Sequence, residues 1–396
     1  MIQKEKIEQA KKIVQEENVD LWLTVGRETG MNSEPVLPLI STLEFGGLTC
    51  VFVTKDEVVC LAGHLDSYGM SQMGIYDEVI TYDKSFKEKF FECLNKYQPK
   101  TIAMNYSMDV AADGLTHGLW LEFQEYFKEA NYDGEILSSS SIINKLRGRK
   151  TPSEVAAIKE AIQVTEKILV EAKDFIEEGK SQIDIHRFCQ ERIAFYQGDN
   201  AWEIKHNPGV MLPNVPGGHA GPGEYQVKKG DLVTLDFGVK MHDYCSDVQR
   251  VYYVLKDEEK EAPKKYQDAL RNIQHAQDEG VKMMRPNTPA YVPDERAREV
   301  IKEFGYPDFN FGFGHQVGRE THDGGVMMGP RWERYLGRVE ANLEINNVFT
   351  VDINILFEDG NIGQEDMAII LEDETVYLTT RQPGIYLCGG KVNECI

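Results

Sequence analysis

The sequence predicts an α+β fold in two domains, a smaller layered α/β domain over residues 1–145 and a larger, β-rich domain with helices over residues 146–396. The first observation is length, because 396 residues exceed the size at which single hydrophobic cores usually stop growing. The second is the alternation of strand and helix patterns in the first third. The third is a strong helix start just after the proposed boundary.

The elements of the smaller domain follow from their residue patterns. Helical periodicity predicts helices at residues 4–17 and 84–96. Short apolar runs predict strands at residues 20–25, 48–54, 57–62 and 101–104.

The larger domain opens on a helix with clear capping signals. Thr151 is a suitable N-cap, Pro152 suits the first helical position, and Glu154 completes a capping box. Apolar residues at helical spacing continue this helix to Leu169. Further helices are expected near residues 182–196, 262–284 and 292–304.

The composition narrows the class of partner and the compartment. Acidic residues outnumber basic ones by 65 to 43, a net charge of −22, which favours solubility and argues against nucleic acid or an anionic membrane as a partner. The seven cysteines are scattered without a CxxC pair, as in a reducing compartment. The sequence has neither a signal-peptide core nor a run of ~18 apolar residues, so a cytoplasmic location is expected.

Two acidic side chains stand in one predicted hairpin. Asp236 lies in the strand pattern of residues 232–239, and Asp247 begins the returning strand at residues 246–253. A turn centred on residues 241 and 242 would place the two roughly opposite each other. Opposed side chains have Cβ atoms about 4.5–5.5 Å apart, so two like charges there repel unless a cation lies between them or one is protonated.

A second predicted hairpin repeats this arrangement. A turn centred on residues 358 and 359 sets Asp352 opposite Glu365. Either pair alone is compatible with acids that face solvent on a half-buried strand. Both pairs in one domain favour a metal site, because buried carboxylates are costly without partners, and carboxylates with an imidazole suit Mn, Co or Zn.

Three histidines are candidates for the same site. His315 is preceded by Gly314 in the glycine-rich residues 311–318, and such glycines allow a close backbone approach to a ligand. His322 follows seven residues later, and His219 lies in residues 216–222, before the first acidic strand. The six other histidines are interpreted as ordinary surface or core residues.

Together these motifs resemble metallopeptidase family M24, which includes Xaa-Pro aminopeptidase, prolidase, methionine aminopeptidase and the non-metal enzyme creatinase. The resemblance depends on Asp-Phe-Gly at 236–238, Ser-Asp-x-x-Arg at 246–250, Gly-His-x-x-Gly-x-x-x-His at 314–322 and Glu-Asp at 365–366. It implies a pita-bread catalytic domain over residues 146–396, preceded by a creatinase- and prolidase-like N-terminal domain over residues 1–145.

The resemblance also implies two divalent ions, Mn, Co or Zn, and a role for each ligand. Asp236 would bind the first ion, His315 and Asp352 the second, and Asp247 and Glu365 would bridge both. Two ions held in this way lower the pKa of a shared water, which supplies hydroxide near neutral pH.

The catalytic roles implied by the resemblance fall on four residues. His219 and His322 would contact the substrate and the tetrahedral intermediate, Asp352 would take a proton, and Arg250 would orient an acidic neighbour. The expected reaction is cleavage of the Xaa-Pro bond of a short peptide by a homodimer.

Some stretches depart from the family pattern. Residues 352–354 are Asp-Ile-Asn where these peptidases usually have Glu-Pro-Gly, and residues 363–366 are Gly-Gln-Glu-Asp where they usually have Arg-Ile-Glu-Asp. Residues 329–335, with arginines and aromatic residues, either recognise a substrate carboxylate or form a surface loop. Two alternatives therefore stay open: an enzyme of this fold that acts on a non-peptide C–N substrate as a hydrolase or lyase, and a degenerate binding protein.

Overall fold

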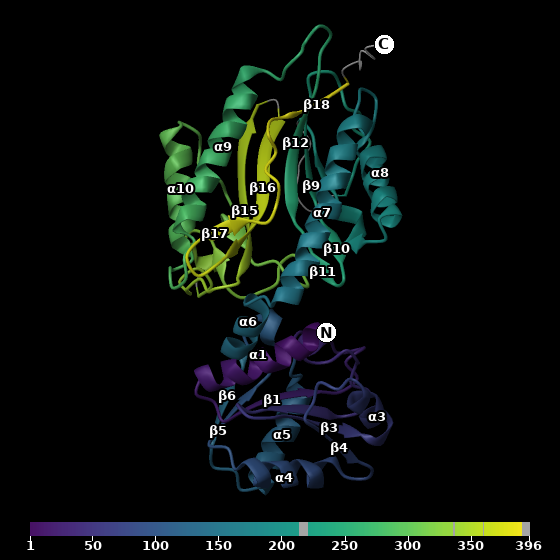
Figure 1. Cartoon of the computed structure of the whole chain (residues 1–396), viewed down its shortest axis with the longest axis vertical. Helices are drawn as coiled ribbons and strands as arrows, with labels where there is room; N and C mark the ends of the chain where they lie inside the picture. The colour runs from purple at the N-terminus through teal and green to yellow at the C-terminus, as the bar shows by residue number, and fades with distance from the viewer. Residues whose placement is uncertain (214–220, 336, 359, 390–396) are drawn as a thin grey trace. The chain divides into compact units, whose positions relative to one another are not determined.

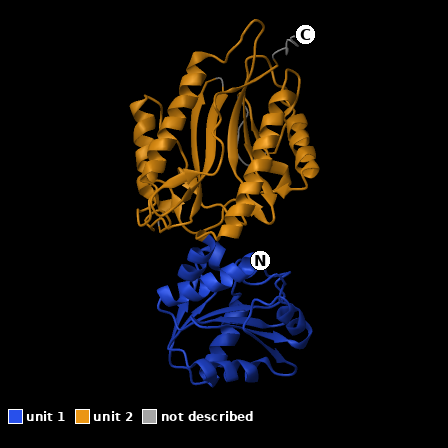
Figure 2. Ribbon diagram, viewed as in Figure 1, with its two compact units in different colours: residues 1–147 blue, residues 148–396 orange. Residues whose placement is uncertain are grey.

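The computed structural model describes residues 1–213, 221–335, 337–358 and 360–389, and the chain divides into two units, residues 1–147 and 148–396 (Figure 2). The six cysteines within the described residues are all buried free thiols. None of the described helices combines the length and the apolar character needed to cross a membrane.

The smaller unit has a mixed six-stranded sheet in the order β4-β3-β2-β1-β5-β6. Its first three strands in sequence are antiparallel neighbours, and the other pairs are parallel. The strands are β1 (Leu21–Gly26), β2 (Thr49–Val53), β3 (Val58–Gly63), β4 (Glu78–Tyr82), β5 (Thr101–Met104) and β6 (Glu135–Ser138). The helices are α1 (Ile2–Glu16), α2 (Leu37–Ile40), α3 (His64–Gln72), α4 (Phe86–Tyr97), α5 (His117–Glu129) and α6 (Ser140–Gly148).

Helices cover both faces of this sheet because its central strands are apolar on both sides. Trp22 of β1 packs in the core with α1 and α6, while the next residue, Leu23, packs with Phe90 of α4 and Phe123 of α5. Figure 1 shows α1 and α6 on one side of the sheet and α4 and α5 on the other. The helices and strands expected in this part of the sequence are confirmed, with ends shifted by one or two residues. Strands β4 and β6 were not anticipated.

Glu34 is a buried carboxyl in the smaller unit. Its side chain is 2% exposed, and its carboxylate accepts hydrogen bonds from the backbone N–H of Val36 and from Nδ2 of Asn105. Burial outweighs these bonds and raises the pKa of Glu34 from 4.5 to about 7. The folded state therefore prefers the neutral acid, so this contribution to stability is complete below pH 4.5 and is lost as the pH rises to about 7.

We expect this one group to lower the free energy of unfolding by about 3 kcal/mol between pH 4 and pH 8. A Glu34→Gln variant cannot titrate at this position and should lack that component, whatever its absolute stability. Urea titrations at pH 4 and pH 8 would measure the difference, with the exposed Glu125→Gln as the matched control. The same pH dependence in the wild type and in Glu34→Gln would contradict the expectation.

The larger unit is built on a sheet in the order β15-β16-β12-β9-β8, with β17 beside β16 and β18 beside β12. Its strands are β8 (Gly209–Met211), β9 (Leu232–Phe237), β12 (Val248–Val254), β15 (Val348–Phe357), β16 (Gly360–Ile370), β17 (Thr375–Tyr377) and β18 (Tyr386–Cys388). Two small sheets contain β7 (Asp199–Asn200), β10 (Val239–Met241) and β11 (Tyr244–Cys245), and β13 (Gly314–His315) and β14 (Met327–Met328).

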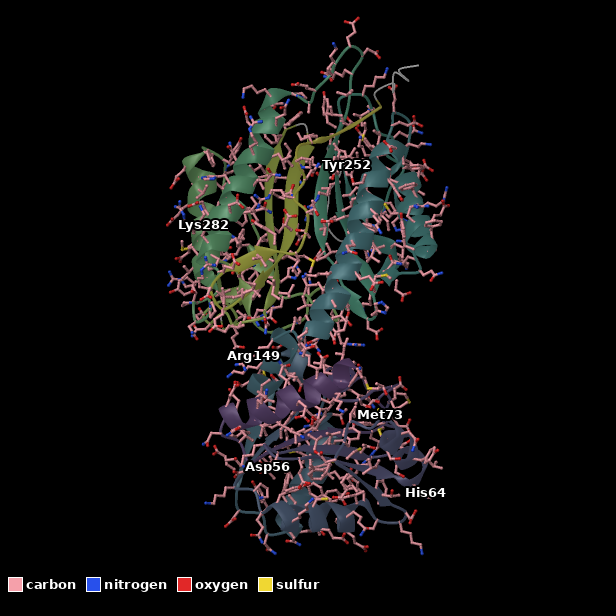
Figure 3. All side chains as sticks on the ribbon, in the orientation of Figure 1. Asp56, His64, Met73, Arg149, Tyr252 and Lys282 are labelled. Atoms are coloured by element: carbon pink, nitrogen blue, oxygen red, sulfur yellow. The ribbon has the colours of Figure 1, made fainter. Side chains whose placement is uncertain are left out.

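Four helices flank this sheet, two beside each half (Figure 1). They are α7 (Pro152–Phe175), α8 (Gln182–Phe195), α9 (Lys264–Met283) and α10 (Tyr291–Glu303). The expected capping box is confirmed, because Glu154 accepts from the N–H of Thr151 at 2.7 Å and its own N–H donates to the Thr151 hydroxyl at 3.4 Å. Tyr252 lies inside this unit and donates to the carbonyl of Leu169 on α7, whereas Lys282 projects from α9 (Figure 3).

The packing of the helices decides which face of the sheet is left for a site. Leu235 and Phe237 of β9 pack in the core with α7 and α8, and Val351 and Ile353 of β15 pack with α9 and α10. Because side chains alternate along a strand, the residues between them, 236 and 352, point to the other face.

Candidate metal centre

A row of polar side chains crosses four strands on the face that these helices leave open. Asp236 on β9 pairs with Gln249 on β12, Gln249 pairs with Glu365 on β16, and Glu365 pairs with Asp352 on β15. Directly paired residues on adjacent strands share a face. The sheet therefore brings Asp236 onto one face with Asp352 and Glu365, which follow it by more than a hundred residues in the sequence.

Of the two predicted pairs of opposed acids, the structure contains one and not the other. The pairing of Asp352 with Glu365 is confirmed. The pairing of Asp236 with Asp247 is wrong, because the turn is centred on His242 and Asp243, one residue later than expected. These two residues have φ angles of 49° and 65°, as a tight two-residue hairpin turn requires. Asp247 is therefore diagonal to Asp236 on the same face, and their carboxyls lie within hydrogen-bonding reach.

His315 completes a compact group with two of the acids. Its Nε2 lies 3.6 Å from Oδ2 of Asp247 and 3.9 Å from Oε1 of Glu365, and single donor atoms of the three residues all lie within 4.8 Å of one another. Gly314 makes this position possible, since a Cβ there would lie 1.9 Å from the carbonyl oxygen of Thr350 on β15. Because glycine has no Cβ, β15 can pack directly against this position.

The electrostatics of these groups suit a cation. Burial raises the pKa of Asp236 to about 6. Burial together with neighbouring carboxylates raises the pKa values of Asp247, Asp352 and Glu365 well above their usual range. Burial, followed by the proximity of His322, lowers the pKa of His315 to about 3, so its imidazole is neutral and can act as a ligand. Crowded carboxylates beside a neutral imidazole are a donor set that fits Mn, Co or Zn.

These residues lie at one pocket of about 1100 Å³. His322 also lines it, with its ring 4.3 Å from that of His315. The pocket combines acids with apolar and amide side chains, and includes Met211, Gln249, Phe309, Phe311, Met327, Tyr335, Arg338, Asn354, Phe357 and Asn361. His219, the other histidine expected to contact substrate, lies outside the described residues.

Arg250 points away from the acids, on the opposite face of the sheet. It is 2% exposed and pairs with the fully buried Asp366 at 2.8 Å. It also donates to the carbonyls of Gln249 and Glu365. Arg250 does not line the pocket. Its ion pair with Asp366 agrees with the expected role of orienting an acidic neighbour, and its bonds to the two carbonyls link the backbones of β12 and β16.

Among the pocket residues that the sequence did not indicate are four polar side chains, Gln249, Arg338, Asn354 and Asn361. Gln249 could have been found, since it follows Asp247 by two residues and so shares its face. Asn354 likewise follows Asp352 by two residues. On the returning strand, Asn361 is two residues before Gly363, which is two residues before Glu365, so all three share a face. Arg338 gave no signal, because it lies in a loop. In residues 329–335 only Tyr335 lines the pocket.

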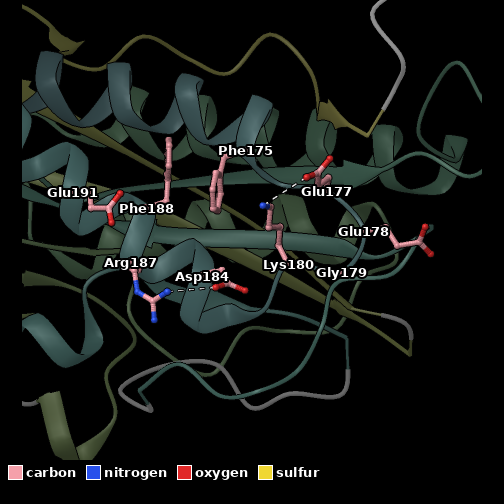
Figure 4. A pocket seen from close by; sticks show the side chains of 9 residues that line it. All are labelled: Phe175, Glu177, Glu178, Gly179, Lys180, Asp184, Arg187, Phe188 and Glu191. Carbon is pink, nitrogen blue, oxygen red and sulfur yellow. Dashed lines mark ion pairs between the residues drawn. The ribbon is translucent and has the colours of Figure 1, made fainter.

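A second hollow lies between the end of α7 and the start of α8 (Figure 4). Phe175 stacks on Phe188 with ring centroids 4.4 Å apart, and the charged residues around them form the pairs Lys180–Glu177 and Arg187–Asp184. No histidine or cysteine lines this hollow. It therefore lacks the ligand set of the first pocket.

Comparison with known proteins gives a consistent family match. The model of metallopeptidase family M24 matches residues 156–379. A putative Xaa-Pro aminopeptidase of Mycoplasma pneumoniae is 27% identical over 65% of this chain and 70% of its own length. An Xaa-Pro dipeptidase of Pyrococcus furiosus is 28% identical over 67% of this chain and 73% of its own length.

Solved structures confirm the expected fold class, an N-terminal domain followed by a pita-bread domain. The X-Pro aminopeptidase of Thermotoga maritima has a TM-score of 0.72 at 21% identity and covers 96% of this chain and 99% of its own. The prolidase of Pyrococcus furiosus has a TM-score of 0.67 at 21% identity, with 94% and 99% covered. The N-terminal domain of the FACT subunit SPT16 from chickpea also matches, with a TM-score of 0.68 at 13% identity over 98% and 99%.

Proposed function

The chain belongs to metallopeptidase family M24, and on that premise we propose that it is a dinuclear enzyme that cleaves the Xaa-Pro bond of short peptides. The observation that carries the proposal is the approach of Asp247, His315 and Glu365, whose donor atoms lie within 4.8 Å of one another, on a sheet face shared with Asp236 and Asp352. Relatives named Xaa-Pro aminopeptidase and Xaa-Pro dipeptidase support the substrate class.

The proposed ligand set uses all five groups. Asp236 would help to hold one ion, His315 and Asp352 would help to hold the other, and Asp247 and Glu365 would contribute to both. When bound, the ions polarise the scissile carbonyl and lower the pKa of a water molecule. Cation binding also relieves the repulsion that raises the pKa values of these carboxyls.

The remaining steps fall to side chains of the pocket. Asp352 would accept the proton that the attacking water loses and return it to the proline nitrogen as the C–N bond breaks. His322, beside His315, donates a hydrogen bond to the carbonyl oxygen as that oxygen gains negative charge. His219 is proposed for the same task. Phe309, Phe311 and other apolar residues of the pocket offer a surface for the proline ring.

A peptide panel tests this function. Protein purified with Mn²⁺ is expected to hold two ions per chain and to hydrolyse Xaa-Pro dipeptides or Xaa-Pro-Yaa tripeptides, but not Xaa-Ala controls. Elemental analysis measures the metal, and release of the N-terminal residue measures turnover. Bound metal without turnover of any peptide would overturn the peptidase assignment, and absence of metal would overturn the metal centre itself.

Arg338 is expected to recognise the carboxylate of a dipeptide. It lines the pocket, its Nε donates to the carbonyl of Gly325 at 2.9 Å, and no ion pair joins it to an acid in the described part of the chain. Losing a hydrogen bond to a charged group costs about 1.5–3 kcal/mol. Arg338→Met should therefore lower kcat/KM for Xaa-Pro dipeptides by about 10- to 100-fold, mainly through KM.

The same variant should hardly affect tripeptides, whose carboxylate lies one residue further on. Arg331→Met is the matched control, because Arg331 pairs with Glu295 and does not line the pocket. Equal losses for dipeptides and tripeptides would show that Arg338 does not read the carboxylate.

One observation favours a second candidate function. Asp352 is a methylene shorter than glutamate, and Asn354 brings an amide beside it at 3.1 Å. An altered position of the proton acceptor suits a non-peptide C–N substrate, cleaved by hydrolysis or elimination. This alternative is supported if metal binds and no peptide of the panel is cleaved.

A further inference from the structure

Three amide side chains form a hydrogen-bonded series beside the acids, and we call Gln249, Asn354 and Asn361 the amide relay. Asn361 Nδ2 donates to Asn354 Oδ1 at 2.7 Å. Asn354 Nδ2 donates to Asp352 Oδ1 at 3.1 Å and to Gln249 Oε1 at 3.3 Å. Gln249 Nε2 donates to Glu365 Oε2 at 3.3 Å. The relay thus ends on two proposed metal ligands.

The hydrogen bonds of the amide relay can have only one order of donors and acceptors. When Asp352 and Glu365 are ionised, as cation binding requires, they can only accept hydrogen bonds, so Asn354 must turn its NH₂ group toward Asp352, and Gln249 must turn its own toward Glu365. Asn354 Oδ1 is then left to accept from Asn361. Asn361 Oδ1 is buried without a hydrogen-bond partner among the described residues. The amide of Asn361 is therefore oriented by the contacts of its Nδ2, which donates to Asn354 at 2.7 Å and lies 3.5 Å from Met211 Sδ.

The two carboxylate oxygens of Glu365 have different neighbours. Oε1 faces His315 Nε2 at 3.9 Å, while Oε2 accepts from Gln249. Asp352 is held on one oxygen in the same manner by Asn354. Each carboxylate is therefore fixed in rotation about its last bond before any cation arrives, and fixing a ligand in this way lowers the cost of binding.

Gly363 provides the space for the relay. A Cβ on this residue would lie 2.2 Å from Asn354 Oδ1 and 2.3 Å from Gln249 Oε1, closer than a side chain can approach. Its φ angle is not in the left-handed region, so space rather than backbone conformation requires glycine here. The two departures from the family pattern, at residues 352–354 and at residue 363, therefore meet at one place.

We propose that the amide relay is a positioning device that aims the carboxylates of Asp352 and Glu365 at the cations. The proposal rests on the proposed function, because it assumes that these carboxylates bind metal. The relay residues touch ligands and are not themselves required to touch substrate. Hydrogen-bond partners of metal ligands typically contribute 10- to 100-fold to metal affinity.

Two isosteric variants test the relay. Asn354→Leu removes the donor to Asp352, and Gln249→Met removes the donor to Glu365, with little change in volume. Each is expected to raise the dissociation constant of Mn²⁺ by about 10- to 100-fold in calorimetric titrations of the metal-free protein. Where peptide turnover is measured, kcat should fall more than KM rises. Because both residues act through one network, the double variant should lose less affinity than the sum of the single losses.

The matched control is Asn310→Leu, since Asn310 lines the same pocket and, among the described residues, its side chain makes no hydrogen bond to the acids. Thermal unfolding in EDTA separates a positioning role from a folding role: the variants should unfold at the wild-type temperature without metal and should lose part of the shift that Mn²⁺ produces. Gly363→Ala should weaken Mn²⁺ in the same direction, by displacing both amides.

The outcomes are distinguishable. Wild-type protein that binds no Mn²⁺ would overturn the proposed function and the relay with it. Wild-type protein that binds Mn²⁺, with affinity unchanged within twofold in both Asn354→Leu and Gln249→Met, would overturn the relay and leave the metal centre in place. A loss of equal size in Asn310→Leu would also overturn it.

Discussion

Asp247→Asn is expected to abolish Mn²⁺ binding at the centre and to lower kcat/KM for Xaa-Pro peptides at least about a thousandfold. Asp247 is the acid common to the compact group with His315 and Glu365 and to the contact with Asp236. Asparagine keeps the shape and loses the charge that attracts a divalent ion. Losing several kcal/mol of transition-state stabilisation corresponds to this change in rate.

The same substitution should not destabilise the metal-free protein. Asp247 is buried among like charges that raise its pKa, so the folded chain without metal either protonates it or bears their repulsion. A neutral amide removes that conflict. In EDTA the urea midpoint of Asp247→Asn should equal or exceed that of the wild type, while the increase that Mn²⁺ gives the wild type should vanish.

Asp66→Asn is a control for the general effect of removing a carboxylate, because Asp66 belongs to the smaller unit and the metal centre to the larger one. It should keep both Mn²⁺ binding and turnover. Full Mn²⁺ affinity in Asp247→Asn would remove this residue from the ligand set, and a large loss of stability in EDTA would show that its charge has a structural partner.

Local sequence patterns are sufficient to predict which residues pair when one strand pattern and one turn determine the register. Asp352 and Glu365 flank a hairpin whose two strands have ten and eleven residues, so a long ladder fixes their register. The register of Asp236 depends on a turn of His242 and Asp243, which lacks the Asn-Gly or Asp-Gly signal of such turns. The turn centre was therefore misplaced by one residue, and the pairing with it.

Contacts between distant elements could not be predicted in this way. The neighbours of β12 are β9 and β16, and only this order places Gln249 between Asp236 and Glu365. The strand pattern shows that Gln249 shares a face with Asp247, but not which acid its amide meets. Arg338 reaches the pocket from a loop, where side-chain direction has no period to follow.

The smaller unit shows the same limit for strands. Strands β1, β2 and β3 are almost wholly buried, and their apolar runs were recognised. Strands β4 and β6 are at the sheet edges and only partly buried, so their sequences lack such runs. Edge strands need fewer apolar residues, because one side of each has no strand neighbour.

Arg250→Met is expected to cost about 3–5 kcal/mol of stability, the usual effect of breaking a buried ion pair from one side. The guanidinium donates to Asp366 and to the carbonyls of Gln249, Glu365 and Thr380, all at 2.8–2.9 Å. Methionine fills similar space, but it removes the cation that pairs with Asp366 and the donor to these carbonyls, and leaves the buried carboxylate with the neutral donors Gln364 and Thr379. Urea unfolding in EDTA measures this loss without the contribution of metal.

The double variant Arg250→Met, Asp366→Leu distinguishes the pair from the backbone contacts. If the Asp366 carboxylate, buried without its cation, causes most of the loss, replacing it should restore much of the stability. Apolar replacements of whole buried ion pairs are often nearly neutral. If the carbonyl contacts cause it, the double variant should remain as unstable as the single one. Because Arg250 holds β12 and β16 at the level of Gln249 and Glu365, the second outcome should also bring weaker Mn²⁺ binding, and the first should not.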